Sequence, residues 1–273
     1  MNNPPRRPLG PIRTFVAVGD SFTEGMSDPY PDTPGHPGNG TYRGWADLLA
    51  DRLATAHPGL RYANLAVRGK LIGQIATDQV PTAATLRADL TTLAGGLNDV
   101  LRPRCDLAAV RGHLEKSATT LADAGGHLVL FRSTDPTRRL KASARLMPRI
   151  EHLVGIVDDL GTRLGATVVD LFTARVFDDP RLWHTDRLHL APEGHRRVTE
   201  AVCEALGLPH DATWRTPLPP APPTPWLDRR KQDARWARTH LGPWLHRRVT
   251  GRSSGDNRPP KHPRLTTWPP DAD

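Results

Sequence analysis

Short apolar runs alternate with amphipathic stretches along most of the chain, and this alternation predicts the fold. The runs expected to form buried strands are Phe15–Val18, Arg61–Val67, Leu90–Leu93, His127–Phe131 and Thr167–Leu171. Apolar residues recur at helical spacing between and after these runs. The stretches with this spacing are Gly44–Ala56, Leu71–Leu86 with a break at Pro81, Asp106–Ala124, Ile150–Leu164 and Pro192–Leu206. Strands joined by short helical connections favour an α/β fold, with a parallel sheet of about five strands covered by helices on both faces.

The pattern changes near Leu208, where we expect the folded domain to end. Prolines cluster at 217–225 and again at 259–270. Within residues 209–250, tryptophan and leucine mixed with arginine over Trp226–Arg248 predict an amphipathic helix in a basic, partly helical extension. Residues 251–273 are polar, rich in proline and short of apolar residues, so we expect them to be disordered. Residues 1–13 are expected to form an N-terminal tail.

Charge is distributed unevenly between these parts. The whole chain carries a formal net charge of +8. From Asp211 onward, 12 Lys and Arg face 6 Asp and Glu, which is a net +6 and leaves +2 for residues 1–210. A basic tail permits a second class of function, a binding protein for nucleic acid or an acidic partner. Arginine also packs over apolar surface and pairs with carboxylates, so we favour a structural tail and expect no nucleic-acid partner.

Cysteine usage and the apolar runs bear on the compartment. The chain has two cysteines, Cys105 and Cys203, which do not resemble a disulfide framework and are expected to be buried thiols. The run Phe15–Val18 is shorter than the roughly 7–15 apolar residues of a signal-peptide core. No run approaches the roughly 18 apolar residues of a membrane span. We therefore expect a cytoplasmic protein without a membrane span.

Residues suited to acyl transfer stand where the predicted strands end. Ser21 follows the first strand, Gly69 the second and Asn98 the third, while Asp186 and His189 precede the last helix. The carboxyl ends of parallel strands meet at one edge of the sheet, where ligands bind. Acyl transfer needs a nucleophile, a base, a group that orients the base and donors for the oxyanion. Each residue also has an ordinary explanation as a turn or helix-cap residue, but their order along the chain favours chemistry.

A competing serine motif occurs in the tail. Residues 251–255 match Gly-x-Ser-x-Gly, with Ser253 at the serine position. That motif requires a preceding strand, a following helix and an acid and histidine further along the chain. Here the match lies in a polar, Pro-rich tail and only His262 remains downstream, so we interpret it as accidental. The histidines show no zinc-binding spacing such as His-Glu-x-x-His, and we expect no metal site.

Four sequence blocks resemble those of the SGNH, or GDSL, hydrolase superfamily. The blocks are Gly19–Phe22, with Phe22 where the GDSL label has leucine, Asn64–Gly69, Gly96–Asp99 and Asp186–His189. The resemblance covers about residues 14–206, and we assign residues 14–208 to the hydrolase domain. It implies a flavodoxin-like three-layer α/β/α sandwich. The extension after Leu208 is not explained by it.

The resemblance also implies roles for individual residues. Ser21 would attack an ester carbonyl, His189 would act as general base and then general acid, and Asp186 would orient His189. The backbone N–H groups of Ser21 and Gly69, with the Asn98 side chain, would form the oxyanion hole. No metal or organic cofactor is implied.

The substrate depends on loops outside these blocks. The Pro- and Gly-rich loop Asp28–Gly40 follows Ser21, and we expect Tyr30, His36 and Tyr42 to line the substrate pocket. We expect a small-molecule partner, a short-acyl or lipid-like carboxylic ester cleaved through an acyl-enzyme. The alternative is an O-deacetylase of a sugar or metabolite. Oligomeric state is left open.

Overall fold

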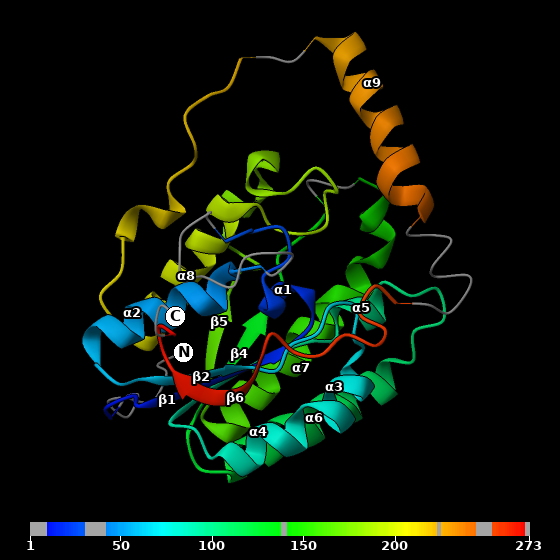
Figure 1. Cartoon of the computed structure of the whole chain (residues 1–273). Helices are drawn as coiled ribbons and strands as arrows, with labels where there is room; N and C mark the ends of the chain where they lie inside the picture. Colours follow the sequence, from blue (N-terminus) through cyan, green and yellow to red (C-terminus); the bar gives the residue numbers. More distant parts are fainter. Residues whose placement is uncertain (1–9, 31–41, 138–140, 223–224, 244–252, 271–273) are drawn as a thin grey trace.

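The apolar runs of the sequence form the centre of a six-stranded sheet (Figure 1). The structure is a computed structural model that describes residues 10–30, 42–137, 141–222, 225–243 and 253–270. Five strands are parallel: β1 (Thr14–Gly19), β2 (Arg61–Asn64), β3 (Leu90–Ala94), β4 (His127–Arg132) and β5 (Thr167–Asp170). The strand order β5-β4-β3-β1-β2-β6 contains the flavodoxin-like order 2-1-3-4-5, so the predicted fold class is confirmed.

Helices cover both faces of the sheet. The α-helices are α1 (Ser21–Glu24), α2 (Gly44–Ala56), α3 (Ile72–Asp78), α4 (Val80–Leu86), α5 (Leu97–Val100), α6 (Leu107–Asp123), α7 (Met147–Leu164), α8 (Pro192–Leu206) and α9 (Trp226–Trp236). Within the described residues, the short 3-10 helices are η1 (Lys141–Leu146), η2 (Arg175–Asp178), η3 (Pro180–Leu182) and η4 (Ala212–Arg215), and η5 (Ala237–Leu241) is a π-helical turn. As predicted, the helical stretch around Pro81 is broken, with Pro81 in the first turn of α4.

The alternation of side chains along β1 supplies two separate cores. Phe15 and Ala17 belong to the core under α2 and α8, whereas Val16 and Val18 belong to the core under α3, α4, α6 and α7. All four side chains are buried, as expected for a central parallel strand. Because the crossovers after β1 and β2 leave on opposite sides, a crevice is expected at the carboxyl ends of β1 and β3.

The C-terminal residues pair with the sheet. The sixth strand, β6 (His262–Thr267), lies antiparallel to β2 at the edge of the sheet (Figure 1). We call residues 253–270 the C-terminal strap. The prediction of disorder for residues 251–273 is therefore wrong for the strap, since edge pairing uses backbone groups and needs no regular apolar pattern. Residues 271–273 lie outside the described residues.

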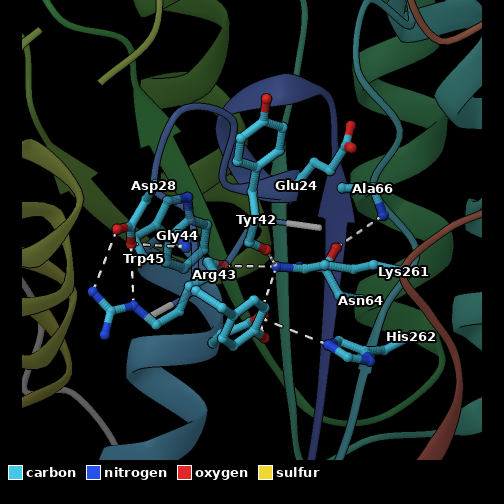
Figure 2. Close-up of polar contacts among 12 residues, drawn as sticks. Glu24, Asp28, Tyr42, Arg43, Gly44, Trp45, Asn64, Ala66, Lys261 and His262 are labelled. Atoms are coloured by element: carbon cyan, nitrogen blue, oxygen red, sulfur yellow. Dashed lines mark hydrogen bonds and ion pairs between the residues drawn. The ribbon is translucent and has the colours of Figure 1, made fainter. Parts of the chain in front are cut away.

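A buried lysine fastens the strap to the domain. Lys261 Nζ donates to the backbone oxygens of Tyr42 (2.7 Å) and Arg43 (2.6 Å), as Figure 2 shows, and lies 2.8 Å from Asp47 Oδ2. Asp47 is fully buried, and although burial acts to raise its pKa, the charge of Lys261 holds that pKa below its usual value. These three oxygen contacts match the three N–H donors of the ammonium group. A lysine charge can be buried only when its donors have such partners.

Helix α9 lies within the predicted extension, and its attachment to the domain differs from that of the strap. It stands away from the body of the molecule in Figure 1, and none of its residues is buried. Among the described helices, none is long and apolar enough to cross a membrane. Cys105 and Cys203 are both free thiols, and Cys203 is buried.

Candidate active site

Ser21 occupies the sharp turn between β1 and α1. The Asp20 side chain caps α1 by accepting a hydrogen bond from the Phe22 N–H at 3.0 Å. The turn is tight at Gly19, where an added Cβ would lie 2.7 Å from the backbone oxygen of Ala94. Both main-chain groups of Gly19 bind the Gln79 side-chain amide, each at 2.9 Å. These contacts hold Ser21 at the carboxyl edge of the sheet.

Asp186 and His189 form one hydrogen-bonded unit in the loop before α8. His189 Nδ1 lies 2.8 Å from Asp186 Oδ2. Asp186 Oδ1 accepts from the N–H groups of Leu188 (2.9 Å) and His189 (3.0 Å). Burial acts to raise the pKa of Asp186, but the hydrogen bond and charge of His189 outweigh it and lower that pKa. An ionised Asp186 places the proton on Nδ1 and leaves Nε2 as an acceptor.

The Asn98 side chain forms hydrogen bonds to two loops at the strand ends. Asn98 lies in α5, and its Nδ2 donates to Asp20 Oδ2 (3.1 Å) and to the backbone oxygen of Lys70 (3.1 Å). Burial raises the pKa of Asp20 to about 6. The amide thus connects the turn that carries Ser21 with the loop that carries Gly69.

Gly69 lies in a turn after β2 with a left-handed backbone, φ +73°. Glycine adopts this conformation without the strain that a side chain would bring. The strap covers this turn, because a side chain at Gly69 would collide with Ser253 Oγ and one at Gly255 would collide with the Arg68 carbonyl oxygen. Ser253, the serine of the competing motif, therefore lies against the predicted oxyanion loop.

Three of the five predicted residues line one cavity of about 110 Å³: Ser21, Asn98 and His189. Asp186 stands behind His189, and Gly69 is not part of the described lining. Ser21 Oγ and the His189 ring make no direct hydrogen bond in the described part of the chain. Catalytic hydrogen bonds are often long or poorly aligned before substrate binds, so the missing bond alone does not argue against the pair.

Most of the remaining wall is apolar, and the sequence analysis did not identify it. The apolar side chains include Leu97, Leu101, Phe131, Leu153 and Leu171. Phe131 in β4 and Leu171 just after β5 follow the same strand-end rule that located Ser21, so that rule could have found them. Leu153 comes from α7, and no local signal marks it. Ser133, just after β4, also lines the cavity, and its buried hydroxyl has no partner within the described residues.

A second histidine on the wall is structural. His195 Nδ1 accepts from the Trp45 N–H at 3.3 Å, and Nε2 contacts the Met26 carbonyl at 3.0 Å. Burial lowers the pKa of His195 to about 4. With both nitrogens committed to backbone, His195 is not available as a base, unlike His189.

The predicted substrate residues are placed elsewhere. Tyr30 is buried, and its hydroxyl donates to Asp47. The Tyr42 ring lies 5.1 Å from the Arg68 guanidinium, next to the Lys261 contacts. Neither tyrosine belongs to the described cavity wall, because Tyr30 bonds to Asp47 of α2 and Tyr42 contacts Arg68 and the strap. His36 lies outside the described residues.

The sheet order is that of a three-layer α/β/α sandwich with a cavity at its carboxyl edge. Residues 17–197 match the GDSL-like Lipase/Acylhydrolase family. The match spans well over half of the chain, and the chain belongs to this family of carboxylic ester hydrolases. A comparison with curated protein sequences found no match.

Solved structures share the fold. LAE5, an alpha/beta hydrolase enzyme from the metagenome of Lake Arreo, Spain, is 21% identical with TM-score 0.58, over 71% of this chain and 95% of that chain. TesA is 22% identical with TM-score 0.56, over 71% and 97%. Axe2, an acetylxylan esterase from Geobacillus stearothermophilus, is 14% identical with TM-score 0.57, over 76% and 100%. At these identities the similarity shows the fold and does not transfer a substrate.

Proposed function

We propose that the protein hydrolyses short-acyl or lipid-like carboxylic esters through an acyl-enzyme on Ser21. One observation carries the proposal: Ser21 and the Asp186-bound His189 share a cavity whose remaining wall is largely apolar. The apolar wall can bind the acyl chain, while Ser21 and His189 can act on the ester carbonyl.

In the first half-reaction, Ser21 Oγ attacks the ester carbonyl carbon while His189 Nε2 takes the hydroxyl proton. Asp186 stabilises the resulting imidazolium through its bond to Nδ1. Collapse of the tetrahedral intermediate breaks the bond to the alcohol oxygen, and His189 returns the proton to that oxygen. The products are the free alcohol and an ester between Ser21 and the acyl group.

Two unpaired backbone donors support an oxyanion hole. Within the described part of the chain, neither the Ser21 N–H nor the Gly69 N–H has a protein acceptor. The Ser21 N–H lies next to the nucleophilic hydroxyl, so a donor without a protein acceptor there favours a role toward the oxyanion, and the resemblance assigns the same role to the Gly69 N–H. The Asn98 amide would add a third donor by exchanging one of its two present acceptors for the oxyanion.

In the second half-reaction, His189 takes a proton from water, and the water oxygen attacks the acyl-enzyme carbonyl. Collapse returns the proton to Ser21 Oγ and releases the carboxylic acid. Water is the only co-reactant, and no atom changes its oxidation state.

The cavity favours a small acyl group, with O-deacetylation of a sugar or metabolite as the alternative. Its volume of about 110 Å³ and its enclosure by leucine and phenylalanine leave little room for a long chain. The similarity in fold to an acetylxylan esterase is compatible with the alternative. A cytoplasmic site and the absence of a nucleic-acid partner remain predictions from composition.

The test is hydrolysis of p-nitrophenyl esters from acetate to decanoate at pH 8, with acetylated xylooligosaccharide as a second substrate. We expect highest activity on the shortest esters and a loss of about 10,000-fold or more in kcat for Ser21→Ala. Ser117→Ala is the matched control, because the Ser117 hydroxyl bonds to the His113 carbonyl within α6. Ser21→Ala activity equal to wild type would refute the mechanism, and activity on the sugar ester alone would select the alternative.

A further inference from the structure

We propose that helix α9, which lies outside the family match, holds the Asp186–His189 loop in its working conformation through Asp233 and Trp236. The inference rests on the proposed function, since it assigns positioning residues to the same site. Neither α9 residue touches the cavity, so both would act through the loop.

Three contacts join α9 to two consecutive residues of the loop. Trp236 Nε1 donates to the backbone oxygen of Asp186 at 2.8 Å. Arg187 donates to Asp233 Oδ1 at 2.6 Å, and its guanidinium lies 4.9 Å from the centre of the Trp236 ring. Asp233 and Trp236 are three residues apart and share one helix face. The helix therefore holds the loop by its main chain and by the Arg187 side chain.

Backbone strain at Arg187 explains why the loop needs contacts that hold it in place. Arg187 has a left-handed backbone, φ +61°, which costs a non-glycine residue about 1 kcal/mol. Strained residues persist where the surroundings fix them. Arg187 lies between Asp186 and His189, so relaxation of its backbone would move the carboxylate relative to the imidazole.

Buried apolar surface contributes little to the attachment of α9 to the domain. No α9 residue is buried, and Trp226 and Leu227 at its start are 60% and 62% exposed. In the described part of the chain, its hydrogen bond, ion pair and ring contact with the domain all involve Asp186 or Arg187. The adjoining η5 adds one ring contact to this loop, between His240 and His184, with centroids 6.4 Å apart. An attachment that buries so little apolar surface and is concentrated at the catalytic loop fits positioning better than core stabilisation.

The experiment compares two tryptophans of the same helix by identical substitutions. Trp236→Phe keeps a ring over Arg187 but removes the donor to Asp186, and Trp226→Phe alters a ring that contacts Arg230 on its own helix. We expect Trp236→Phe to lower kcat on the best ester by about 2- to 10-fold, the usual range for one hydrogen bond. KM and the unfolding midpoint should stay unchanged, because neither the cavity wall nor a core is altered.

A spectroscopic readout reports the loop directly. The His189 Nδ1 proton in its bond to Asp186 should give a low-field proton NMR resonance, identified by its loss in Asp186→Ala. We expect this resonance to broaden or weaken in Trp236→Phe and in Asp233→Asn, and to be unchanged in Trp226→Phe. Asp233→Asn removes the ion pair and leaves both rings, so it decides the question if Trp236→Phe fails to fold.

The proposal is overturned if wild type is active and Trp236→Phe and Asp233→Asn match Trp226→Phe in both kcat and the resonance. Failure of the proposed function looks different. A wild type inert on every ester would refute that function, while the resonance in the three variants would still decide whether α9 holds the loop.

Discussion

Helix α9 and the C-terminal strap are both basic and both contain tryptophan, yet they attach to the domain in opposite ways. In the strap, Trp268 is 3% exposed and the Lys261 side chain 5% exposed. In α9, Trp226 is 60% exposed and the Lys231 side chain 80% exposed. Composition therefore does not decide burial here; the available partner does.

The partners explain the difference. Lys261 meets the buried carboxylate of Asp47, and Trp268 stacks edge-on to Tyr62 with ring centroids 5.0 Å apart while its Nε1 donates to Asp51. Among the described residues, helix α9 meets a partly buried loop through Asp186 and Arg187. We expect the strap to contribute to stability and α9 to contribute to turnover, and paired substitutions in the two segments test that division.

Lys261→Met should show the largest effect on stability. It leaves the buried Asp47 carboxylate without its cation, and removing one partner of a buried ion pair typically costs about 3–5 kcal/mol. Lys231→Met, on the exposed face of α9, should leave the unfolding curve unchanged. Urea denaturation followed by tryptophan fluorescence measures both, and equal midpoints for the two variants would contradict the division.

A second comparison between the strap and α9 uses truncated tryptophans, Trp268→Ala in the strap and Trp226→Ala in α9. Truncating a buried tryptophan typically costs about 3–5 kcal/mol, whereas exposed substitutions change stability by about 0.5 kcal/mol or less. We expect Trp268→Ala to lower the thermal midpoint by several degrees and Trp226→Ala to leave it in place. A small effect at Trp268 would mean that the strap rests on the sheet without stabilising it.

A smaller effect is expected in the acid dependence of stability. The pKa of Asp47 is lowered in the folded state from its ordinary 3.8, so the charged carboxylate favours folding at higher pH. This contribution is complete above the unfolded value and is lost as pH falls through the folded value. The difference in unfolding free energy between wild type and Asp47→Asn should therefore be constant above about pH 5 and shrink below about pH 4. A difference that stays constant down to pH 2 would exclude a charged Asp47.

Local pattern was sufficient for strands β1–β5 and the helices between them, but not for the end of the domain, because Trp214 and Trp268 beyond Leu208 lie in the core. The buried run before Ser21, the break at Pro81 and the helical spacing in α6 and α8 follow from steric and periodic rules that act over a few residues. The placement of Ser21, Asn98 and His189 around one cavity follows from the strand-end rule, because parallel strands bring their carboxyl ends together.

Long-range contacts were not predictable from these rules. Tyr30 and Tyr42 were expected in the pocket, but Tyr30 binds Asp47 and Tyr42 lies beside the Lys261 ammonium and the Arg68 guanidinium. The strap was expected to be disordered because its sequence has no apolar period. Its burial depends on partners about 200 residues away in the chain, which no local window contains.

By itself, the sequence determined the order of strands and helices, the edge of the sheet that carries the chemistry and the family blocks. Only the tertiary structure decided that Trp236 contacts the loop of Asp186 and that the strap covers Gly69. The physical reason is range: periodicity and turn chemistry act between near neighbours, whereas an edge strand and a buried ion pair are selected by whichever surface the rest of the fold leaves open.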